Sequence, residues 1–238
     1  TGTFTSSQLT GKTLSLLETA TGTSNLIISI DVAGQTVNFS NLSTVSFDNG
    51  SDTLTINGMY GSENITGPNI SSTLDGKGGN DIISGGSAVD TIIGEAGADT
   101  LTGNGGNDIF SISSSHSGLT EATADTIVDF TAGADKLKLG LAGNATSNTG
   151  NYVEASSAIT DFSAALTAAN TALNTLNTGT GSSPNYNTNT HLYSFQFDSS
   201  PSEIGYLFKD KDSDGDADSV IILSGINNTE IAASDIIA

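Results

Sequence analysis

No cysteine occurs among the 238 residues, so no disulfide bond can hold this chain together, and the usual cysteine clue to its compartment is missing. Tryptophan is also absent, and aromatic residues make up only 6% of the chain, whereas glycine occurs 28 times. A core packed by aromatic rings is therefore not expected. The composition predicts a turn-rich backbone that is packed by small aliphatic side chains.

Positive charge is equally scarce. The chain has 6 Lys and Arg residues against 26 Asp and Glu residues, which gives a formal net charge of -20. This balance argues against nucleic acid as a partner, and its self-repulsion opposes folding unless cations neutralise it. Acidic chains can be disordered, but here the acidic residues recur at fixed spacings beside apolar residues, which favours an ordered structure.

Long apolar runs are missing as well. No stretch approaches the roughly 20 apolar residues that are needed to span a bilayer. The polar start at Thr1 has no basic region followed by an apolar core, so we expect no secretory signal there. If the protein is exported, its address lies elsewhere or has been removed.

What the chain does have is a nine-residue repeat. Each copy contains a glycine, an aspartate five residues later, and an apolar residue two residues after the aspartate. The glycines are Gly76, Gly85, Gly94 and Gly103, the aspartates are Asp81, Asp90, Asp99 and Asp108, and the apolar residues are Ile83, Ile92, Leu101 and Phe110. A nonapeptide of this form predicts a turn that presents a carboxylate and a very short strand, coiled into a parallel β-helix that binds Ca²⁺.

The repeat also predicts which aspartates are neighbours. With two nonapeptides per coil, residues 18 apart stack at the strand spacing of about 4.7–4.9 Å, which pairs Asp81 with Asp99 and Asp90 with Asp108. Two carboxylates about 5 Å apart repel by roughly 3 kcal/mol at an effective dielectric constant near 20. A cation between them reverses the sign. Ca²⁺ suits the position because it takes about six to eight hard oxygens, including backbone carbonyls.

These residues, from Gly76-Lys-Gly-Gly-Asn-Asp81 to Gly103-Asn-Gly-Gly-Asn-Asp108, resemble the RTX (repeats-in-toxin) family, whose members are secreted by Gram-negative type I systems. The resemblance is specific over residues 76–111 and looser over 47–75. It implies a β-roll with several Ca²⁺ ions, each held by carbonyls and aspartates of two turns on one edge. One implied site uses Gly76, Gly78, Asp81, Glu95, Gly97 and Asp99, and a second uses Gly85, Ser87, Asp90, Asn104, Gly106 and Asp108. Ala88 stands where the family has glycine, so we expect strain in that turn.

A second acidic cluster lies near the end of the chain. The alternating aspartates Asp210, Asp212, Asp214, Asp216 and Asp218, with Gly215 at the sixth place, match the front of an EF-hand loop. Ile221 occupies the twelfth place, where an EF-hand has its glutamate. The segment is interpreted either as a calcium-binding turn between strands or as a solvated acidic hairpin.

Three further aspartates follow the repeats. Asp125, Asp129 and Asp135 resemble the segment after the repeats in RTX proteins, where acidic residues can complete a last calcium site. Capping of the solenoid alone also explains their apolar neighbours.

The rest of the chain predicts a mainly β protein with three regions: an N-terminal β-strand region over 1–46, a solenoid with its cap over 47–140, and a helix plus small antiparallel sheet over 141–238. Strands are expected at 13–17, 26–32, 36–39, 45–47, 192–197, 204–208 and 219–223. Residues 157–176 carry an apolar stripe at helical spacing, which predicts one helix packed against the sheet. The ending Asp235-Ile-Ile-Ala238 resembles a type I secretion signal, although by spacing it can equally be a final strand.

Neither His116 nor His191 has a metal-ligand spacing or a nucleophile partner, so no enzyme activity is expected.

The Ser/Thr/Asn/Gly-rich, lysine-poor composition resembles that of RTX-type S-layer proteins. The leading hypothesis is a module for calcium-dependent folding, secretion and assembly of an extracellular bacterial surface (S-layer) protein. Its partners would be the type I machinery and another copy of itself or a cell-surface glycan. The alternatives are the calcium-binding export domain of an RTX protease or lipase, and an RTX adhesin.

Overall fold

The computed structural model of the chain describes residues 2–5, 15–16, 25–44, 53–113, 116–143, 151–155, 158–178, 191–198, 203–226 and 231–238. Its contacts divide the chain into two compact units, Thr1–Ser111 and Ile112–Ala238. Among the described residues, no helix has the length and apolarity needed to cross a membrane.

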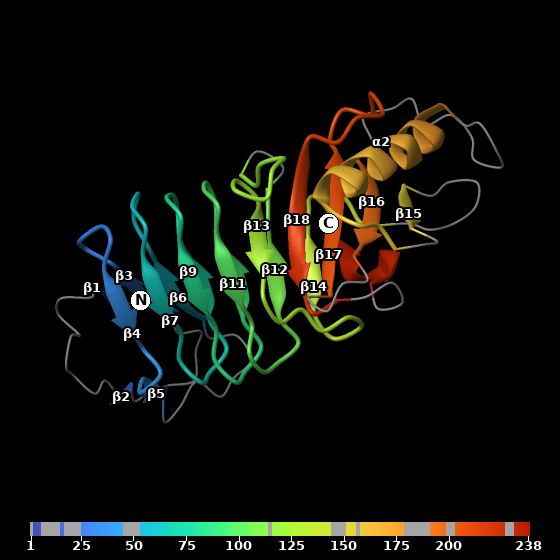
Figure 1. Cartoon of the computed structure of the whole chain (residues 1–238). Helices are drawn as coiled ribbons and strands as arrows, with labels where there is room; N and C mark the ends of the chain where they lie inside the picture. The colour runs from blue at the N-terminus through green and yellow to red at the C-terminus, as the bar shows by residue number, and fades with distance from the viewer. Residues whose placement is uncertain are drawn as a thin grey trace. The chain divides into compact units, whose positions relative to one another are not determined.

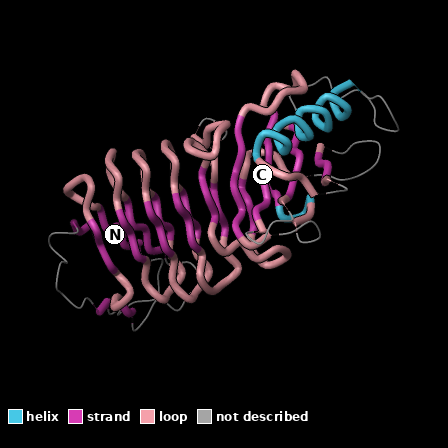
Figure 2. Tube along the Cα trace, in the orientation of Figure 1, coloured by secondary structure: helices cyan, strands magenta, loops and turns pink. Residues whose placement is uncertain are grey.

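The first unit is a parallel β-solenoid, which confirms the predicted fold (Figures 1 and 2). From β6 to β12, successive strands alternate between two sheets, and turns join them at both ends. In the order of the sheet, the first row is β1 (Gly2–Thr5), β3 (Asn25–Ser29), β6 (Thr53–Asn57), β8 (Thr73–Asp75), β10 (Thr91–Ile93) and β12 (Ile109–Ser111). The second row is β4 (Thr36–Asn38), β7 (Asn64–Thr66), β9 (Ile82–Ser84) and β11 (Thr100–Thr102). A separate parallel pair is formed by β2 (Ser15–Leu16) and β5 (Ser43–Thr44).

Each three-residue strand of the repeats places its middle, apolar side chain in the core. Ile92 pairs in register with Leu74 on one side and with Phe110 on the other, and all three are fully buried. Equivalent residues are thus 18 apart, as the repeat predicts. Because side chains alternate along a strand, the residues on either side of the apolar one point outward.

The coil that precedes the repeats is longer. Leu26 pairs with Leu54 and Ile28 with Ile56, so equivalent residues there are 28 apart, and each strand buries two side chains instead of one. The two sheets therefore continue across the predicted boundary between residues 46 and 47. Of the strand predicted at 13–17, only Ser15 and Leu16 are described, and residues 45–47 lie outside the described residues.

The second unit combines a mixed sheet with a helix and a short strand pair. The sheet has the order β15 (Tyr152–Glu154), β16 (Leu192–Phe197), β17 (Ile204–Asp210), β18 (Ser219–Ser224) and β13 (Asp125–Ile127). The pairs β16–β17 and β17–β18 are antiparallel, as predicted, whereas β15 and β13 join them in parallel. Separately, β14 (Lys136–Lys138) pairs with β19 (Ile236–Ile237), so the tail forms a strand.

The predicted helix is present as α2 (Phe162–Thr178), packed on this sheet. It begins five residues later than predicted because Asp161 caps it: the Asp161 carboxylate accepts the N–H of Ala164 at 2.8 Å. The predicted apolar stripe faces the core, with Ala169 and Leu173 fully buried beside Phe208 of β17. This packing agrees with a structural role for the stripe.

Candidate metal centre

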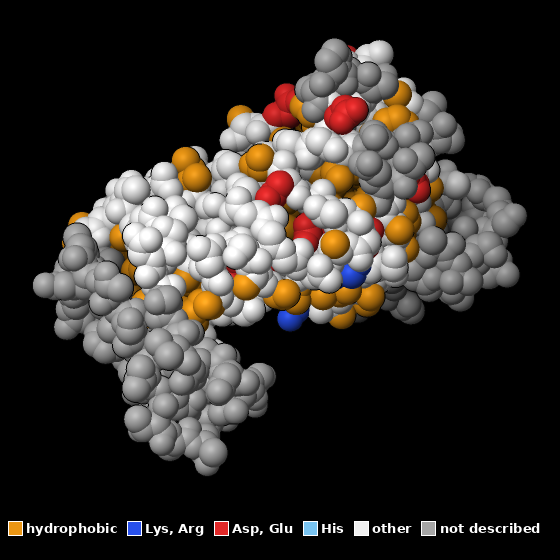
Figure 3. Space-filling view, turned by 90° about the horizontal axis from the view of Figure 1, so that it is seen from below, with side chains coloured by type: hydrophobic (Ala, Val, Ile, Leu, Met, Phe, Trp, Pro, Cys, Tyr) orange, Lys and Arg blue, Asp and Glu red, His pale blue; other side chains and the backbone are white. Residues whose placement is uncertain are grey.

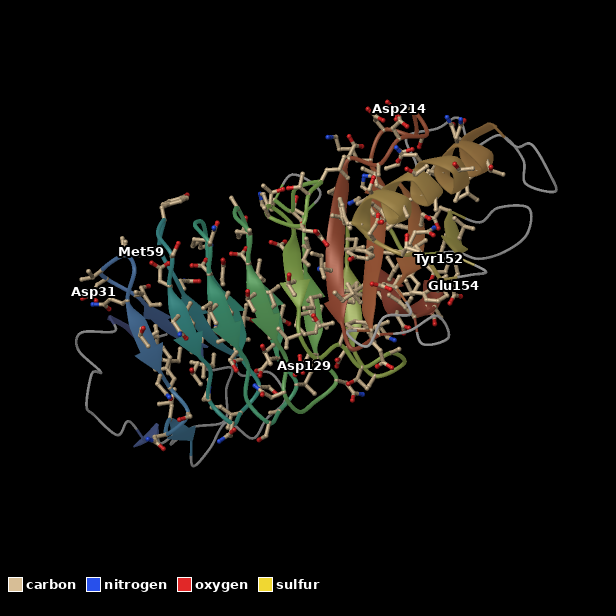
Figure 4. All side chains as sticks on the ribbon, in the orientation of Figure 1. Asp31, Met59, Asp129, Tyr152, Glu154 and Asp214 are labelled. Carbon is tan, nitrogen blue, oxygen red and sulfur yellow. The ribbon has the colours of Figure 1, made fainter. Side chains whose placement is uncertain are left out.

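The repeat turns of the first unit line two edges of the solenoid. The Asp81 edge comprises turns 58–63, 76–81 and 94–99, and the Asp90 edge comprises turns 67–72, 85–90 and 103–108. Met59, labelled at the left of Figure 4, lies in the first turn of the Asp81 edge. The opposite edge, seen from below in Figure 3, presents mainly backbone and uncharged side chains because its aspartates are buried.

Each repeat aspartate directly precedes a strand and points inward, two residues before the buried apolar side chain. Asp81, Asp90, Asp99 and Asp108 are each only 1% exposed. Burying a carboxylate is costly unless it is hydrogen-bonded or paired with a cation. Each of the four carboxylates therefore needs hydrogen-bond donors or a cation to compensate its charge.

Part of the compensation comes from the backbone of the preceding coil. The Oδ1 atom of Asp99 accepts the N–H of Asp81 at 2.8 Å, and the Oδ1 atom of Asp108 accepts the N–H of Asp90 at the same distance. These hydrogen bonds span 18 residues. They place Asp81 beside Asp99 and Asp90 beside Asp108, as the repeat predicts.

The compensation is incomplete at Asp81. Its Oδ1 atom accepts the N–H of Glu63 at 2.7 Å, but its Oδ2 atom is buried without a hydrogen-bond partner among the described residues. Burial, with a smaller contribution from the negative charges of Asp99 and Glu63, raises the pKa of Asp81 to about 7, although the hydrogen bond from the Glu63 N–H opposes the shift. A buried oxygen with excess negative charge suits a hard cation such as Ca²⁺.

Asp90 is better compensated. Its Oδ1 atom accepts both the N–H and the hydroxyl of Ser72 at 2.8 Å, and its Oδ2 atom accepts the N–H of Gly86 at 2.8 Å. Burial still raises its pKa, although these hydrogen bonds oppose the shift. The charge that remains for a cation is therefore greater at Asp81 than at Asp90.

The turns have the backbone conformation that the repeat requires. Lys77, Glu95 and Asn104 occupy the second position of their turns and have φ angles of 78°, 67° and 65°. Gly79, at the fourth position, has φ 117°, and a Cβ atom there would lie 2.0 Å from the Gly61 carbonyl oxygen. Only glycine fits this close stacking of one turn on the next.

The expectation of strain at Ala88 is wrong. Ala88 is absent from the residues with positive φ, so this turn does not repeat the left-handed fourth position. Turn 85–90 has its own conformation, in which Gly86 lies against the preceding turn: a Cβ atom on Gly86 would be 1.8 Å from the Pro68 carbonyl oxygen. The alanine is accommodated because the close approach to the preceding turn is made by Gly86 and not by the fourth residue.

Several carbonyls near the predicted ligands accept hydrogen bonds. The Gly78 carbonyl accepts the N–H of Gly61 at 2.6 Å, and the Gly85 carbonyl accepts the side-chain amide of Asn104 at 2.9 Å. Ca²⁺ at these carbonyls would share or replace these bonds. Carboxylate and carbonyl oxygens, together with the unpartnered Oδ2 of Asp81, form a donor set that fits Ca²⁺.

The acidic loop between β17 and β18 is the only place in the described parts of the chain where three acidic side chains can converge on one ion. Oxygens of Asp210, Asp212 and Asp218 lie within 4.8 Å of one another. Asp214, labelled in Figure 4, and Asp216 lie outside this group. The structure thus brings together three of the five aspartates predicted there.

Hydrogen bonds already organise this loop. The Asp210 carboxylate is buried and accepts the N–H groups of Ser213 at 2.6 Å and Gly215 at 2.9 Å. Burial raises the pKa of Asp210, against these bonds. Lys211 forms an ion pair with Asp218 at 3.3 Å, which supplies some positive charge locally. Calcium binding by this loop stays a prediction.

Asp125, Asp129 and Asp135 do not form a comparable group. Asp125 is buried and donates its N–H to Ser117, and the Asp135 carboxylate accepts the N–H of Thr131 at 2.8 Å. Asp129, labelled near the centre of Figure 4, is only half-buried. Their local contacts suit the capping role that was the alternative prediction.

The raised pKa of Asp81 leads to a testable pH dependence. A folded-state pKa above the ordinary value of 3.8 means that the metal-free fold binds a proton more tightly than the unfolded chain, so its stability falls as the pH rises from about 4 to about 7. Calcium must displace this proton. As the pH rises toward 7, we expect the half-saturating Ca²⁺ concentration to fall by up to about tenfold per pH unit. Above pH 7 this concentration should become constant.

Calcium titrations followed by circular dichroism between pH 5.5 and 8.5 measure this dependence. The Asp81→Asn variant provides the control, because it should show a weaker slope below pH 7. A half-saturating concentration that does not change with pH in the unmodified chain would contradict the assignment.

Residues 75–110 match the RTX calcium-binding nonapeptide repeat family, in four copies. No curated protein matches the chain. The matched residues include both pairs of stacked aspartates, and they fold as successive half-coils of a parallel solenoid. RTX nonapeptides bind calcium and are typical of secreted proteins. The chain thus carries a calcium-binding RTX repeat segment over residues 75–110.

Proposed function

We propose that the chain is a calcium-dependent folding module of a bacterial protein that is exported by a type I system and assembles in a surface layer. The observation that carries the folding role is the stack of buried aspartates, in which Asp81 keeps one oxygen without a hydrogen bond. The role in the surface layer is supported by the Ser/Thr/Asn/Gly-rich, lysine-poor composition. The proposed activity is structural and involves no catalysis.

In this proposal calcium decides whether the repeats fold. When calcium is scarce, the stacked carboxylates repel one another and the segment stays unfolded, which suits export. Outside the cell the ion is plentiful, and binding free energy becomes folding free energy. At free Ca²⁺ about 100 times the dissociation constant, each independent site contributes roughly 2.7 kcal/mol.

The described outer surface of the repeat strands fits assembly better than catalysis. Two columns of uncharged side chains run across the second sheet: Thr36, Asn64, Ile82 and Thr100, and Asn38, Thr66, Ser84 and Thr102. None of these positions is charged, although the chain has a net charge of -20. A flat uncharged face lowers the repulsion between two copies of an otherwise acidic protein.

Electron microscopy of the full-length protein, with calcium and with a chelator, tests this proposal. We expect ordered sheets in calcium and dispersed particles in chelator. An equal concentration of Mg²⁺ serves as the control and should give no sheets. Soluble monomers that hydrolyse protein or lipid in the presence of calcium would favour the export domain of a protease or lipase.

A further inference from the structure

Glu63 occupies the place of the repeat aspartate in turn 58–63, one coil before Asp81. It is 2% exposed. Its Oε1 atom accepts the N–H of Gly34 at 2.6 Å, and its Oε2 atom accepts the N–H of Met59 at 3.1 Å. Both carboxylate oxygens therefore have a backbone donor.

The contact with Gly34 depends on the length of the glutamate side chain. Gly34 lies 29 residues earlier, in the turn of the long first coil, and has a φ angle of 73°. That turn packs closely on turn 58–63: a Cβ atom on Gly61 would lie 2.7 Å from Cβ of Ala33. An aspartate, which is one methylene shorter, would not extend as far toward this donor.

Glu63 also touches the first calcium turn. Its own N–H donates to Oδ1 of Asp81 at 2.7 Å. Asp81 is thereby held by one oxygen, and its Oδ2 atom keeps no hydrogen-bond partner among the described residues. Glu63 thus connects the preceding coil, through its side chain, with the carboxylate of Asp81, through its backbone.

The two side chains differ in what they leave for a cation. Both oxygens of Glu63 are occupied by N–H donors, and such charge-assisted hydrogen bonds compensate a buried carboxylate without a metal. By contrast, the Oδ2 atom of Asp81 has no hydrogen-bond partner among the described residues and is available to a cation. On the Asp90 edge, Ser72 stands at the equivalent place and donates its hydroxyl and N–H to Asp90, so it also acts as a donor.

We propose that Glu63 is a positioning residue for the calcium site of the Asp81 edge and not a calcium ligand. It locks turn 58–63 without metal, and the locked turn orients the Asp81 carboxylate so that Oδ2 is available to the ion. This inference rests on the proposed calcium-dependent folding. It places the first Ca²⁺ ion of the Asp81 edge between turns 76–81 and 94–99.

The test measures calcium binding on each edge separately. The double variant Asp90→Asn, Asp108→Asn leaves the Asp81 edge intact, and Asp81→Asn, Asp99→Asn leaves the Asp90 edge intact. Glu63→Ala and Glu63→Gln are added to each, and Glu203→Gln, an exposed glutamate of the second unit, is the control with the same change of charge. Isothermal titration with Ca²⁺ gives the number of ions and the affinity.

On the Asp81 edge, we expect Glu63→Ala to raise the dissociation constant about tenfold, the change that about 1.4 kcal/mol produces, with the number of ions unchanged. Glu63→Gln keeps one acceptor oxygen and should have a smaller effect of roughly threefold. On the Asp90 edge neither variant should change the affinity. A general loss of structure would instead weaken both edges.

Two results would overturn the inference. A loss of one bound ion in Glu63→Ala would make Glu63 a ligand, and an unchanged affinity on the Asp81 edge would remove its positioning role. If a double variant fails to fold, amide hydrogen exchange is measured at saturating Ca²⁺ for Glu63→Ala in the otherwise unmodified chain. The amides of turn 76–81 should then exchange faster than in the unmodified chain. Those of turn 85–90 should exchange at the same rate. An unmodified chain that binds no calcium would refute the proposed function itself.

Discussion

Removal of calcium is expected to unfold the repeat coils over residues 76–111. The loss follows from the burial of four aspartates, of which Asp81 keeps one oxygen without a hydrogen-bond partner among the described residues. Two sites at 100 times their dissociation constant contribute about 5 kcal/mol, which is comparable to the whole stability of a small domain. In chelator, we expect the β signal in far-ultraviolet circular dichroism to fall and peptides from 76–111 to exchange their amide hydrogens rapidly.

The second unit provides an internal control. Strands β16, β17 and β18 are held by antiparallel pairing and by a core that includes Phe195, Leu207 and Leu223, all fully buried. Their amides should stay better protected than those of the repeats. Ca²⁺ should restore the lost signal and equal Mg²⁺ should not, because Mg²⁺ demands octahedral geometry and gives up its water reluctantly. Spectra that are identical with and without calcium would reject the switch.

The repeats show how much of the fold and of the site could be predicted from sequence. The same nine-residue period governs the buried apolar residue and the buried aspartate, so one pattern predicts the solenoid, the 18-residue coil and the pairing of Asp81 with Asp99. The prediction succeeded here because Asp81 and Asp99, and Asp90 and Asp108, lie in repeats that stack directly on one another. In such repeats, the spacing of residues along the sequence directly predicts which residues are in contact.

The contacts of the 28-residue coil that precedes the repeats could not be predicted in this way. Glu63 binds the N–H of Gly34 across a 28-residue coil that has no repeat, so nothing in the spacing reveals which residues are stacked there. Analogy between repeats failed at Ala88, because its turn lacks the left-handed fourth position and instead stacks closely on Pro68 through Gly86. The parallel strand β15 was missed because three residues are too few to show a period.

Gly79→Ala is expected to have a large effect for the addition of a single methyl group. Gly79 has φ 117°, a conformation that is costly for a residue with a side chain. The added Cβ atom would also lie 2.0 Å from the carbonyl oxygen and 2.3 Å from the carbonyl carbon of Gly61, so the backbone of two stacked turns must move apart. We expect a loss of about 2–4 kcal/mol in the free energy of unfolding with calcium present.

Gly105→Ala is the matched control. It adds the same methyl group to a repeat turn, but the nearest atom to its Cβ is 3.5 Å away, and Gly105 has no positive φ angle. Chemical denaturation in saturating Ca²⁺ should therefore give Gly105→Ala a stability within about 1 kcal/mol of the unmodified chain. Because the Gly79 substitution separates turn 76–81 from turn 58–63, it should also weaken calcium binding on the Asp81 edge. Equal stability of the two variants would show that the turns do not stack this closely in solution.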